Sequence, residues 1–476
     1  MKTTRILTMA MGFGLAAVGT LSDADSPARG AFVTTYPNAS GSSATYNVAG
    51  AIDFGNPFFQ SLGTNGRSCV SCHQPAQGWG ISPPELRARF ESTAGLDPIF
   101  RLNDGANSPK ADVSTVEKRR AAYGMLLAKG LIRVGIGIPD GAEFVLDSVD
   151  DPYGYASAKE LSLFRRPLPS ANLKYLNTVM WDGRETFLDA NSPDCIRGTT
   201  KCFAALHVDL AHQSNGATEG HAQAASPIGD AQREAIVRFE MGLFTAQSYD
   251  NDAKALDGQN ANGGPLSVAA ADSYFGINDV LVGDYRSGKA FDPVVFRMFD
   301  AWASPARGGA DDASPATKKA RDAVARGQAL FNTKPIPITG VKGINDDLGI
   351  AMLPGTCTTC HDTPNGGNHS IPMPLDIGLT DAARATPDLP LYVLRNVATG
   401  QRITTTDPGR ALITGLWKDV GRFKGPVLRS LASRPPYFHN GSAATLRDAV
   451  DFYDTRFGIG FTDQEKADLV AFLKSL

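Results

Sequence analysis

The fold of this chain is decided by Cys69-Val-Ser-Cys72-His73 and by Cys357-Thr-Thr-Cys360-His361. Both stretches have the pattern Cys-x-x-Cys-His, which is typical of covalent attachment of c-type haem. Two thiols three positions apart can each form a thioether with a haem vinyl group, and the adjacent imidazole becomes an axial ligand of the iron. A zinc site shared by the two cysteine pairs is the alternative, but it leaves the position of both histidines unexplained. The sequence therefore predicts two covalently bound haem c groups.

The first residues have the composition of a secretory signal peptide. Lys2 and Arg5 are followed by the mostly apolar run 6–18 and then by polar residues from Ser22 onward. This run is too short to span a bilayer, and a retained anchor is the alternative. We predict a signal peptide at residues 1–24 and a periplasmic mature protein without a membrane span.

Length and charge narrow the class of protein. A chain of 476 residues is too long for one ordinary core, so we expect more than one domain. The 46 basic and 49 acidic residues give a net charge of -3, which argues against nucleic acid as a partner. The 49 glycines and 30 prolines predict many ordered loops. We place an N-terminal haem domain at residues 25–235 and a C-terminal haem domain at residues 236–476.

Helical patterns extend along much of the chain. Apolar residues recur with helical spacing at 231–244 and 318–331. Two further helices are predicted to begin after Thr445 and Thr462, where capping boxes precede apolar stripes. Weak strand-like alternation at 81–165 favours helices there as well. We therefore predict a mainly α fold with two tandem cytochrome c-type haem domains and long ordered loops.

Two cysteines lie outside the haem motifs. Cys195 and Cys202 enclose the short polar segment Ile-Arg-Gly-Thr-Thr-Lys. In an oxidising compartment we expect a disulfide bond that closes this loop. A redox-active dithiol is the alternative.

Three further stretches carry a family resemblance. They are Val179-Met-Trp181-Asp-Gly-Arg-Glu185, Arg326-Gly-Gln-Ala-Leu-Phe331, and Pro435-Pro-Tyr-Phe-His-Asn-Gly441 followed by Thr445-Leu-Arg-Asp-Ala-Val450. With two Cys-x-x-Cys-His motifs in this order, the chain resembles the bacterial dihaem cytochrome c peroxidases and the MauG-type dihaem enzymes. The resemblance runs from about residue 50 to the C-terminus, with insertions near residues 100–160 and 250–310.

This resemblance implies a division of labour between two haems. The N-terminal haem, with His73 as its proximal ligand, would meet hydrogen peroxide. The C-terminal haem, with His361 as its proximal ligand, would store or relay an oxidising equivalent, and Trp181 would lie between the two. The implied enzyme is a periplasmic dihaem peroxidase of MauG type, which uses hydrogen peroxide to form a high-valent dihaem state that oxidises a protein or a small donor.

Other functions of a dihaem protein stay open. The first is an electron-fed cytochrome c peroxidase that detoxifies hydrogen peroxide with electrons from a small cytochrome or cupredoxin. The second is a non-enzymatic dihaem electron-transfer cytochrome with both irons six-coordinate. A dihaem oxygenase acting on polyisoprene shares some motifs but is generally a longer chain. The electron donor or protein substrate carries no signature in the sequence.

The residue at position 453 separates the two peroxidase types. Electron-fed peroxidases present a Met about seventeen residues after the second Pro of the Pro-Tyr-Phe-His motif, and MauG-like enzymes present a Tyr. Counted from Pro436, this position is Tyr453. A phenolate favours higher oxidation states of iron, whereas a thioether favours the ferrous state. The resemblance implies that Tyr453 is the second axial ligand; His369 and Met373 are rival ligands, and a core tyrosine is the structural alternative.

A polar stretch after Trp181 is predicted to supply the distal side of the first haem. Cleavage of peroxide needs a group that takes a proton from one oxygen and returns it to the other. The resemblance implies a Gln and a Glu about ten residues apart here. Gln213 fits the first position, but the second falls on Gln223, which departs from the family pattern, so the candidates for proton transfer are Gln213 and the nearby Glu219 and His221. A solvated loop, or a zinc site built from His207, His212 and His221, is the alternative.

The resemblance also implies one calcium ion between the haems, held largely by backbone oxygens. The matching carbonyls belong to Arg434 and Pro436, and Asn172 is the best candidate for a side-chain ligand. His439, in the Tyr-Phe-His stretch, is interpreted as a structural hydrogen-bonding residue.

Overall fold

The computed structural model describes residues 32–197, 199–303 and 313–476. The predicted signal peptide, residues 1–24, lies outside these described residues. In the three described ranges, no helix is both long enough and apolar enough to cross a bilayer. The predicted N-terminal domain is therefore described from Phe32 onward.

The described chain combines helices with several small antiparallel sheets, so the prediction of a mainly α fold is wrong. Three of the strands even lie within 81–165, where helices were expected. The strands are short, and many pair with segments far away in sequence. A short strand offers too few alternating positions for its period to stand out from the flanking loops.

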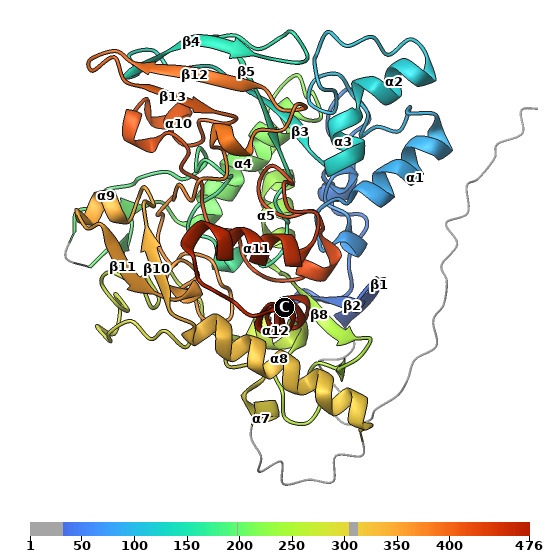
Figure 1. Cartoon of the computed structure of the whole chain (residues 1–476). Helices are drawn as coiled ribbons and strands as arrows, with labels where there is room; N and C mark the ends of the chain where they lie inside the picture. The colour runs from blue at the N-terminus through green and yellow to red at the C-terminus, as the bar shows by residue number, and fades with distance from the viewer. Residues whose placement is uncertain (1–31, 198, 304–312) are drawn as a thin grey trace, which may run out of the picture.

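The elements follow one another in a mixed order (Figure 1). The helices are α1 (Pro83–Thr93), α2 (Val116–Ala122), α3 (Gly124–Lys129), α4 (Leu206–Gly220), α5 (Asp230–Met241), α6 (Gly264–Ala270), α7 (Asp300–Ala303), α8 (Pro315–Thr333), α9 (Asn345–Leu348), α10 (Ala411–Thr414), α11 (Leu446–Phe457) and α12 (Asp463–Lys474). The strands are β1 (Val33–Asn38), β2 (Gly41–Asn47), β3 (Ile132–Ile136), β4 (Phe144–Asp150), β5 (Leu161–Arg165), β6 (Asp194–Cys195), β7 (Cys202–Phe203), β8 (Leu243–Asp250), β9 (Lys254–Ala255), β10 (Ile336–Thr339), β11 (Met352–Gly355), β12 (Leu391–Asn396) and β13 (Arg402–Thr405).

One four-stranded sheet, in the order β1-β2-β8-β9, connects the start of the described chain to its middle. Its central pair places Thr45 opposite Thr245, and both side chains are buried. The helix predicted at 231–244 therefore ends early. It stops at Met241, and the next residues enter β8 because they pair with β2.

A three-stranded sheet, in the order β13-β12-β4, joins the two halves of the sequence. In Figure 1, β4 and β12 lie side by side at the top although their colours are far apart on the bar. The register shifts between Val393 and Leu394, which marks a bulge. Tyr392 and Leu394 point into an apolar cluster beneath this sheet.

Both C-terminal helices begin where the sequence predicts. The hydroxyl of Thr445 accepts a hydrogen bond from the Asp448 backbone, and the hydroxyl of Thr462 accepts one from Glu465. In each case the acidic side chain bonds back to the backbone N–H of the capping residue, which completes a capping box.

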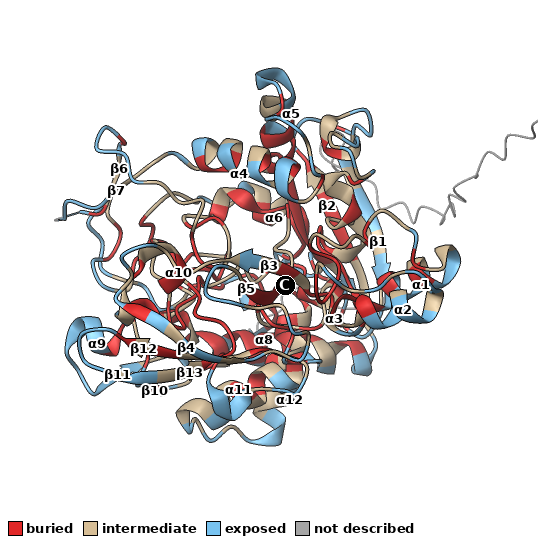
Figure 2. Ribbon diagram, turned by 90° about the horizontal axis from the view of Figure 1, so that it is seen from above, coloured by how far each residue is buried: buried red, intermediate tan, exposed pale blue. Residues whose placement is uncertain are grey.

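The main core lies where α12 packs against α8. Phe296, Phe331 and Phe472 meet there with ring centroids between 5.3 and 5.7 Å apart. Figure 2 shows buried residues concentrated in the middle of the molecule, with exposed residues along its edge. Gly327 of α8 lets the two helices approach closely, since a Cβ atom there would lie 2.0 Å from the carbonyl oxygen of Asp468.

Replacing Gly327 should therefore separate these helices. We expect Gly327→Ala to lower the free energy of unfolding by about 1–3 kcal/mol, because an added methyl must push backbone out of a packed interface. Denaturant unfolding of the purified protein measures this change. Gly220→Ala is the matched control, because a Cβ atom at this helical glycine meets nothing within 4 Å. Equal midpoints for both variants would contradict the role of Gly327.

Candidate functional site

The first Cys-x-x-Cys-His motif forms one tight turn. Cys69–Ser71 is a short 3-10 helix, and the backbone N–H of His73 donates to the carbonyl of Cys69 at 3.0 Å. The ring nitrogen Nδ1 of His73 lies 3.2 Å from the carbonyl oxygen of Trp79. Burial lowers the pKa of His73 to about 4, so its imidazole is neutral. A neutral imidazole whose Nδ1 is held by a carbonyl presents Nε2 as a metal ligand.

The second motif repeats this arrangement. Cys357–Thr359 is again a 3-10 helix, and Nδ1 of His361 lies 2.6 Å from the carbonyl oxygen of Gly367. Burial lowers the pKa of this imidazole and raises the pKa of Cys360 to about 12. Reactive dithiols have lowered thiol pKa values, so these cysteines do not have the electrostatics of a redox pair. Both turns instead have the local geometry that haem attachment requires.

A large cavity adjoins the second motif. The space between protein atoms here is about 1800 Å³, including open solvent at the mouth of the cavity. Its walls are mostly apolar, and they are built from residues of both the N-terminal and the C-terminal half of the chain. The lining includes Arg166, Trp181, Phe331, Cys357, Cys360, His361, His369, Phe423, Lys424, Pro436, His439 and Tyr453. This is a space for a large apolar group attached at Cys357 and Cys360.

Buried positive charge around the cavity tests whether haem fits. Lys424 lines the cavity, and Arg429 directly follows the lining residue Leu428. Both side chains are almost fully buried, and no carboxylate forms an ion pair with either of them in the described ranges. Burial, with a smaller effect of the nearby Arg434 charge, lowers the pKa of Lys424 to about 7. In Arg429, Nε and Nη2 are buried without a hydrogen-bond partner. Unpaired buried cations are costly, and the propionate carboxylates of haem are suitable partners, so the residues present fit haem.

Tyr453 lies at this same cavity. It is on α11, and its ring is 6.1 Å from that of Phe438 and 6.4 Å from that of Phe457. Burial raises the pKa of its phenol, and the nearby thiols of Cys360 and Cys357 raise it further. The structure thus brings Tyr453 close to the second cysteine pair. The rival His369 also lines the cavity. Met373 is not among the lining residues, but it packs in the apolar cluster that contains Cys357 and Cys360.

Trp181 and His439 form the wall of the cavity on the side of the N-terminal half. The indole Nε1 of Trp181 donates to the carbonyl of Arg166 at 2.7 Å, and its ring is 6.1 Å from that of His439. The His439 ring is stacked on Phe423 with centroids 4.1 Å apart. Both of its ring nitrogens are buried without a partner. The interpretation of the His439 side chain as a structural hydrogen-bonding group is therefore wrong.

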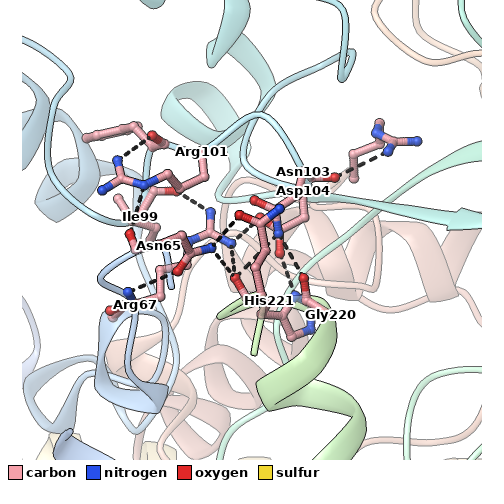
Figure 3. Close-up of polar contacts among 12 residues, drawn as sticks. Asn65, Arg67, Ile99, Arg101, Asn103, Asp104, Gly220 and His221 are labelled. Atoms are coloured by element: carbon pink, nitrogen blue, oxygen red, sulfur yellow. Dashed lines mark hydrogen bonds and ion pairs between the residues drawn. The ribbon is translucent and has the colours of Figure 1, made fainter. Parts of the chain in front are cut away.

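A polar network lies beside the first motif (Figure 3). Nδ1 of His221 is 2.5 Å from Oδ2 of Asp104, whose other oxygen accepts from the buried Arg67. Burial alone would raise the pKa of Asp104, but the hydrogen bond from His221 and the charge of Arg67 hold it below its usual value. Arg67, two residues before Cys69, also donates from Nη1 to the carbonyl of His221 at 3.2 Å, which connects His221 to the chain at the first motif.

The other predicted distal residues lie elsewhere on α4. Glu219 is exposed and Gln213 is half-buried. His207 and His212 pair instead with Glu234 at 2.9 Å and Glu185 at 2.5 Å. In the described part of the chain, no three His, Cys, Asp or Glu side chains gather as a metal site. Of the sequence candidates, His221 is the one that the structure connects to the first motif.

Glu240 was missed by the sequence reasoning. Its carboxyl is buried beside Cys69, and burial raises its pKa to about 8 despite a hydrogen bond with Ser170. The sequence contains one sign of this residue, because Glu240 is an acidic residue between the apolar Phe239 and Met241 at the end of α5.

Outside both motifs, Cys195 and Cys202 form a disulfide bond that closes the β6–β7 hairpin.

Most of the predicted calcium ligands form hydrogen bonds within the protein. The side-chain oxygen of Asn172 accepts from the Thr245 backbone at 2.9 Å, and its nitrogen donates to the Thr245 carbonyl at 2.8 Å. The carbonyl of Arg434 accepts a hydrogen bond from the guanidinium of Arg166 at 3.2 Å. Two of the three groups expected on calcium therefore already have protein partners.

Comparisons with known proteins point to one family. No family model matches the chain. The cytochrome-c peroxidase IdrP1 of Pseudomonas sp. (strain SCT) is 33% identical over 150 residues, covering 27% of this chain and 38% of the relative. The cytochrome c551 peroxidase of Nitrosomonas europaea is 42% identical over 69 residues, covering 14% of this chain and 21% of the relative. A crystal structure of a MauG-like protein associated with microbial copper homeostasis aligns with 88% of this chain and 86% of its own at 17% identity and a TM-score of 0.39.

The sequence matches confirm the resemblance to the bacterial cytochrome c peroxidases. The chain spans less than two-fifths of the length of the curated relatives it matches. The Tyr-ligated subgroup is not part of what these matches support, so ligation by Tyr453 stays a prediction.

Proposed function

We propose that this protein is a dihaem c-type peroxidase that reduces hydrogen peroxide and oxidises a protein or a small donor, in the periplasm. The observation that carries this proposal is the repeated turn, in which Nδ1 of His73 and of His361 each meets a backbone carbonyl. When bound, haem iron supplies the site for peroxide and the one-electron chemistry. Reduction of one peroxide to two waters consumes two electrons and two protons, so the residues must deliver protons and conduct charge.

Conduction between the two motifs is the role we assign to Trp181. Its indole lines the cavity of the second motif, and its hydrogen bond to the Arg166 carbonyl fixes its orientation. An aromatic ring held in this way can carry charge without moving. The two predicted domains, 25–235 and 236–476, would then exchange oxidising equivalents across this ring.

A spectroscopic titration tests the function. The purified holoprotein should contain two covalent haems per chain, and hydrogen peroxide should change the ferric spectra of both. In Trp181→Phe the first haem should still react, and the second should no longer be oxidised. Trp417→Phe is the control, because this residue packs against a separate cluster away from the cavity. Absence of covalent haem, or spectra indifferent to peroxide, would reject the proposal.

We assign proton transfer at the first haem to His221. Asp104 accepts from Nδ1 and thereby fixes the ring, which leaves Nε2 for the substrate. An imidazole is suited to exchange protons near neutral pH. The Arg67 charge keeps Asp104 ionised, so the orienting carboxylate is present over the same pH range.

Substitution of His221 and of Glu219 shows which of the two residues transfers protons at the first haem. His221→Ala should lower the second-order rate constant for reaction with peroxide by about 10²–10⁴-fold, as for loss of a general acid–base. Glu219→Gln should leave this rate unchanged, since its side chain is exposed on the same helix end. Stopped-flow mixing measures both. The assignment fails when Glu219→Gln gives the larger loss.

We assign Tyr453 as a residue that, together with His361, would hold the iron of the C-terminal haem. Its phenol faces the cavity that holds His361, and binding to iron would remove the proton that burial otherwise retains. An anionic ligand there favours oxidised iron, which agrees with a MauG-like role rather than an electron-fed one. His369 is the second candidate, because its Nδ1 is buried without a partner at the same cavity.

Electron paramagnetic resonance distinguishes these ligands. In Tyr453→Phe the signal of the second ferric haem should change, because the axial phenolate is lost, while the signal of the first haem stays as in the wild type. His369→Ala should leave both signals unchanged. The reverse pattern would assign the ligand to His369.

A further inference from the structure

Arg166 connects several chain segments that are far apart in the sequence, and no sequence motif predicts this role. It follows β5 directly, and all of its backbone polar groups are used. Its N–H donates to the carbonyl of His439 at 2.7 Å, and its own carbonyl accepts from Nε1 of Trp181 at 2.7 Å. The backbone of Arg166 thus holds the indole of Trp181 and the backbone of His439, two residues whose rings form one wall of the cavity.

The guanidinium of Arg166 binds backbone oxygens from three distant segments. Nη1 donates to the carbonyl of Lys129 at 2.8 Å, and Nη2 donates to the carbonyl of Ile81 at 2.7 Å and to that of Arg434 at 3.2 Å. These carbonyls come from the loop before α1, the end of α3, and the stretch before the Pro-Pro-Tyr-Phe-His motif. A planar guanidinium with five donors suits this divided arrangement.

The charge of Arg166 is buried and lacks a carboxylate. The residue is 7% exposed, and no ion pair of its side chain occurs in the described ranges. Burial, and then the nearby charge of Arg434, lowers the pKa of Arg166 to about 9, so it stays protonated at neutral pH. A cation surrounded by carbonyl oxygens is the chemical environment that calcium sites in proteins also offer.

We propose that the guanidinium of Arg166 takes the place of the calcium ion that the family resemblance implies, so that this protein needs no calcium. The carbonyl of Arg434, expected on calcium, is bound to Arg166, and the side chain of Asn172 is bound to Thr245 on both of its atoms. A permanent side-chain cation joins the segments and keeps Trp181 in place. Arg166 is therefore a positioning residue, and the proposal does not depend on the reaction with peroxide.

Calcium dependence of the wild-type holoprotein is the direct test. We expect no stoichiometric calcium in the purified protein by elemental analysis. The thermal midpoint should be the same with EGTA and with added CaCl₂. One calcium per chain, with a midpoint that EGTA lowers and calcium restores, would overturn the proposal. Neither measurement uses peroxide, so its outcome is separate from that of the proposed function.

Substitution tests the connecting role itself. Arg166→Ala should lower the thermal midpoint by several degrees, because three buried carbonyls lose their donor. Arg87→Ala is the matched control, since Arg87 is exposed and its Nη1 donates to a single carbonyl, that of Leu127, at 3.0 Å. Arg166→Lys, which keeps the charge without the planar fork, should fall between the wild type and Arg166→Ala. Equal midpoints for Arg166→Ala and Arg87→Ala would overturn the role, and the calcium measurement decides the proposal even where Arg166→Ala does not fold.

Discussion

Positive charge buried without carboxylate partners is the constraint on which this structure depends. Removing such charges from water costs free energy, and the protein compensates for this cost in two ways. Arg166 is surrounded by backbone carbonyls of its own chain. Lys424 keeps an unpaired charge at the cavity, where an anionic cofactor would stabilise the fold as well as bind. Because Arg166 is satisfied by the protein itself and the charge at the cavity is not, the region around the cavity can be both a rigid frame and a binding site. It also explains why haem and folding are expected to be coupled here.

The surroundings of the two Cys-x-x-Cys-His turns differ in a way that suits different tasks. Beside the first turn, an ionised Asp104 orients a half-exposed His221, so protons can reach solvent. Beside the second turn, the walls are apolar and Tyr453 is enclosed by aromatic rings. Proton delivery needs water nearby, whereas storage of an oxidising equivalent benefits from its exclusion. The polar network beside the first turn supports the proton transfer proposed for His221.

What the sequence predicted correctly depends on contacts within a few residues. The capping boxes at Thr445 and Thr462 are local, and so are the bonds that shape each haem turn. The sheets are not local: β4 pairs with β12 from the other half of the chain, and no window of sequence contains both. The same reason applies to the residue proposed for proton transfer. Glu219 and His221 are equivalent by spacing, and only Asp104, from a distant loop, distinguishes them. Buried Arg166 was missed because arginine is normally exposed.

The pairing of distant segments also bears on the division into two haem domains. β8, from the C-terminal half, completes the sheet that β1 and β2 begin, and β12 pairs with β4. Arg166, from the N-terminal half, reaches Arg434, while Trp181 of the same half lines the cavity of the second motif. The second site is therefore built from both halves, and its geometry requires their association. The relay proposed for Trp181 needs a fixed separation between the two motifs, and interleaved strands with a shared buried arginine fix that separation more firmly than a linker between independent domains could.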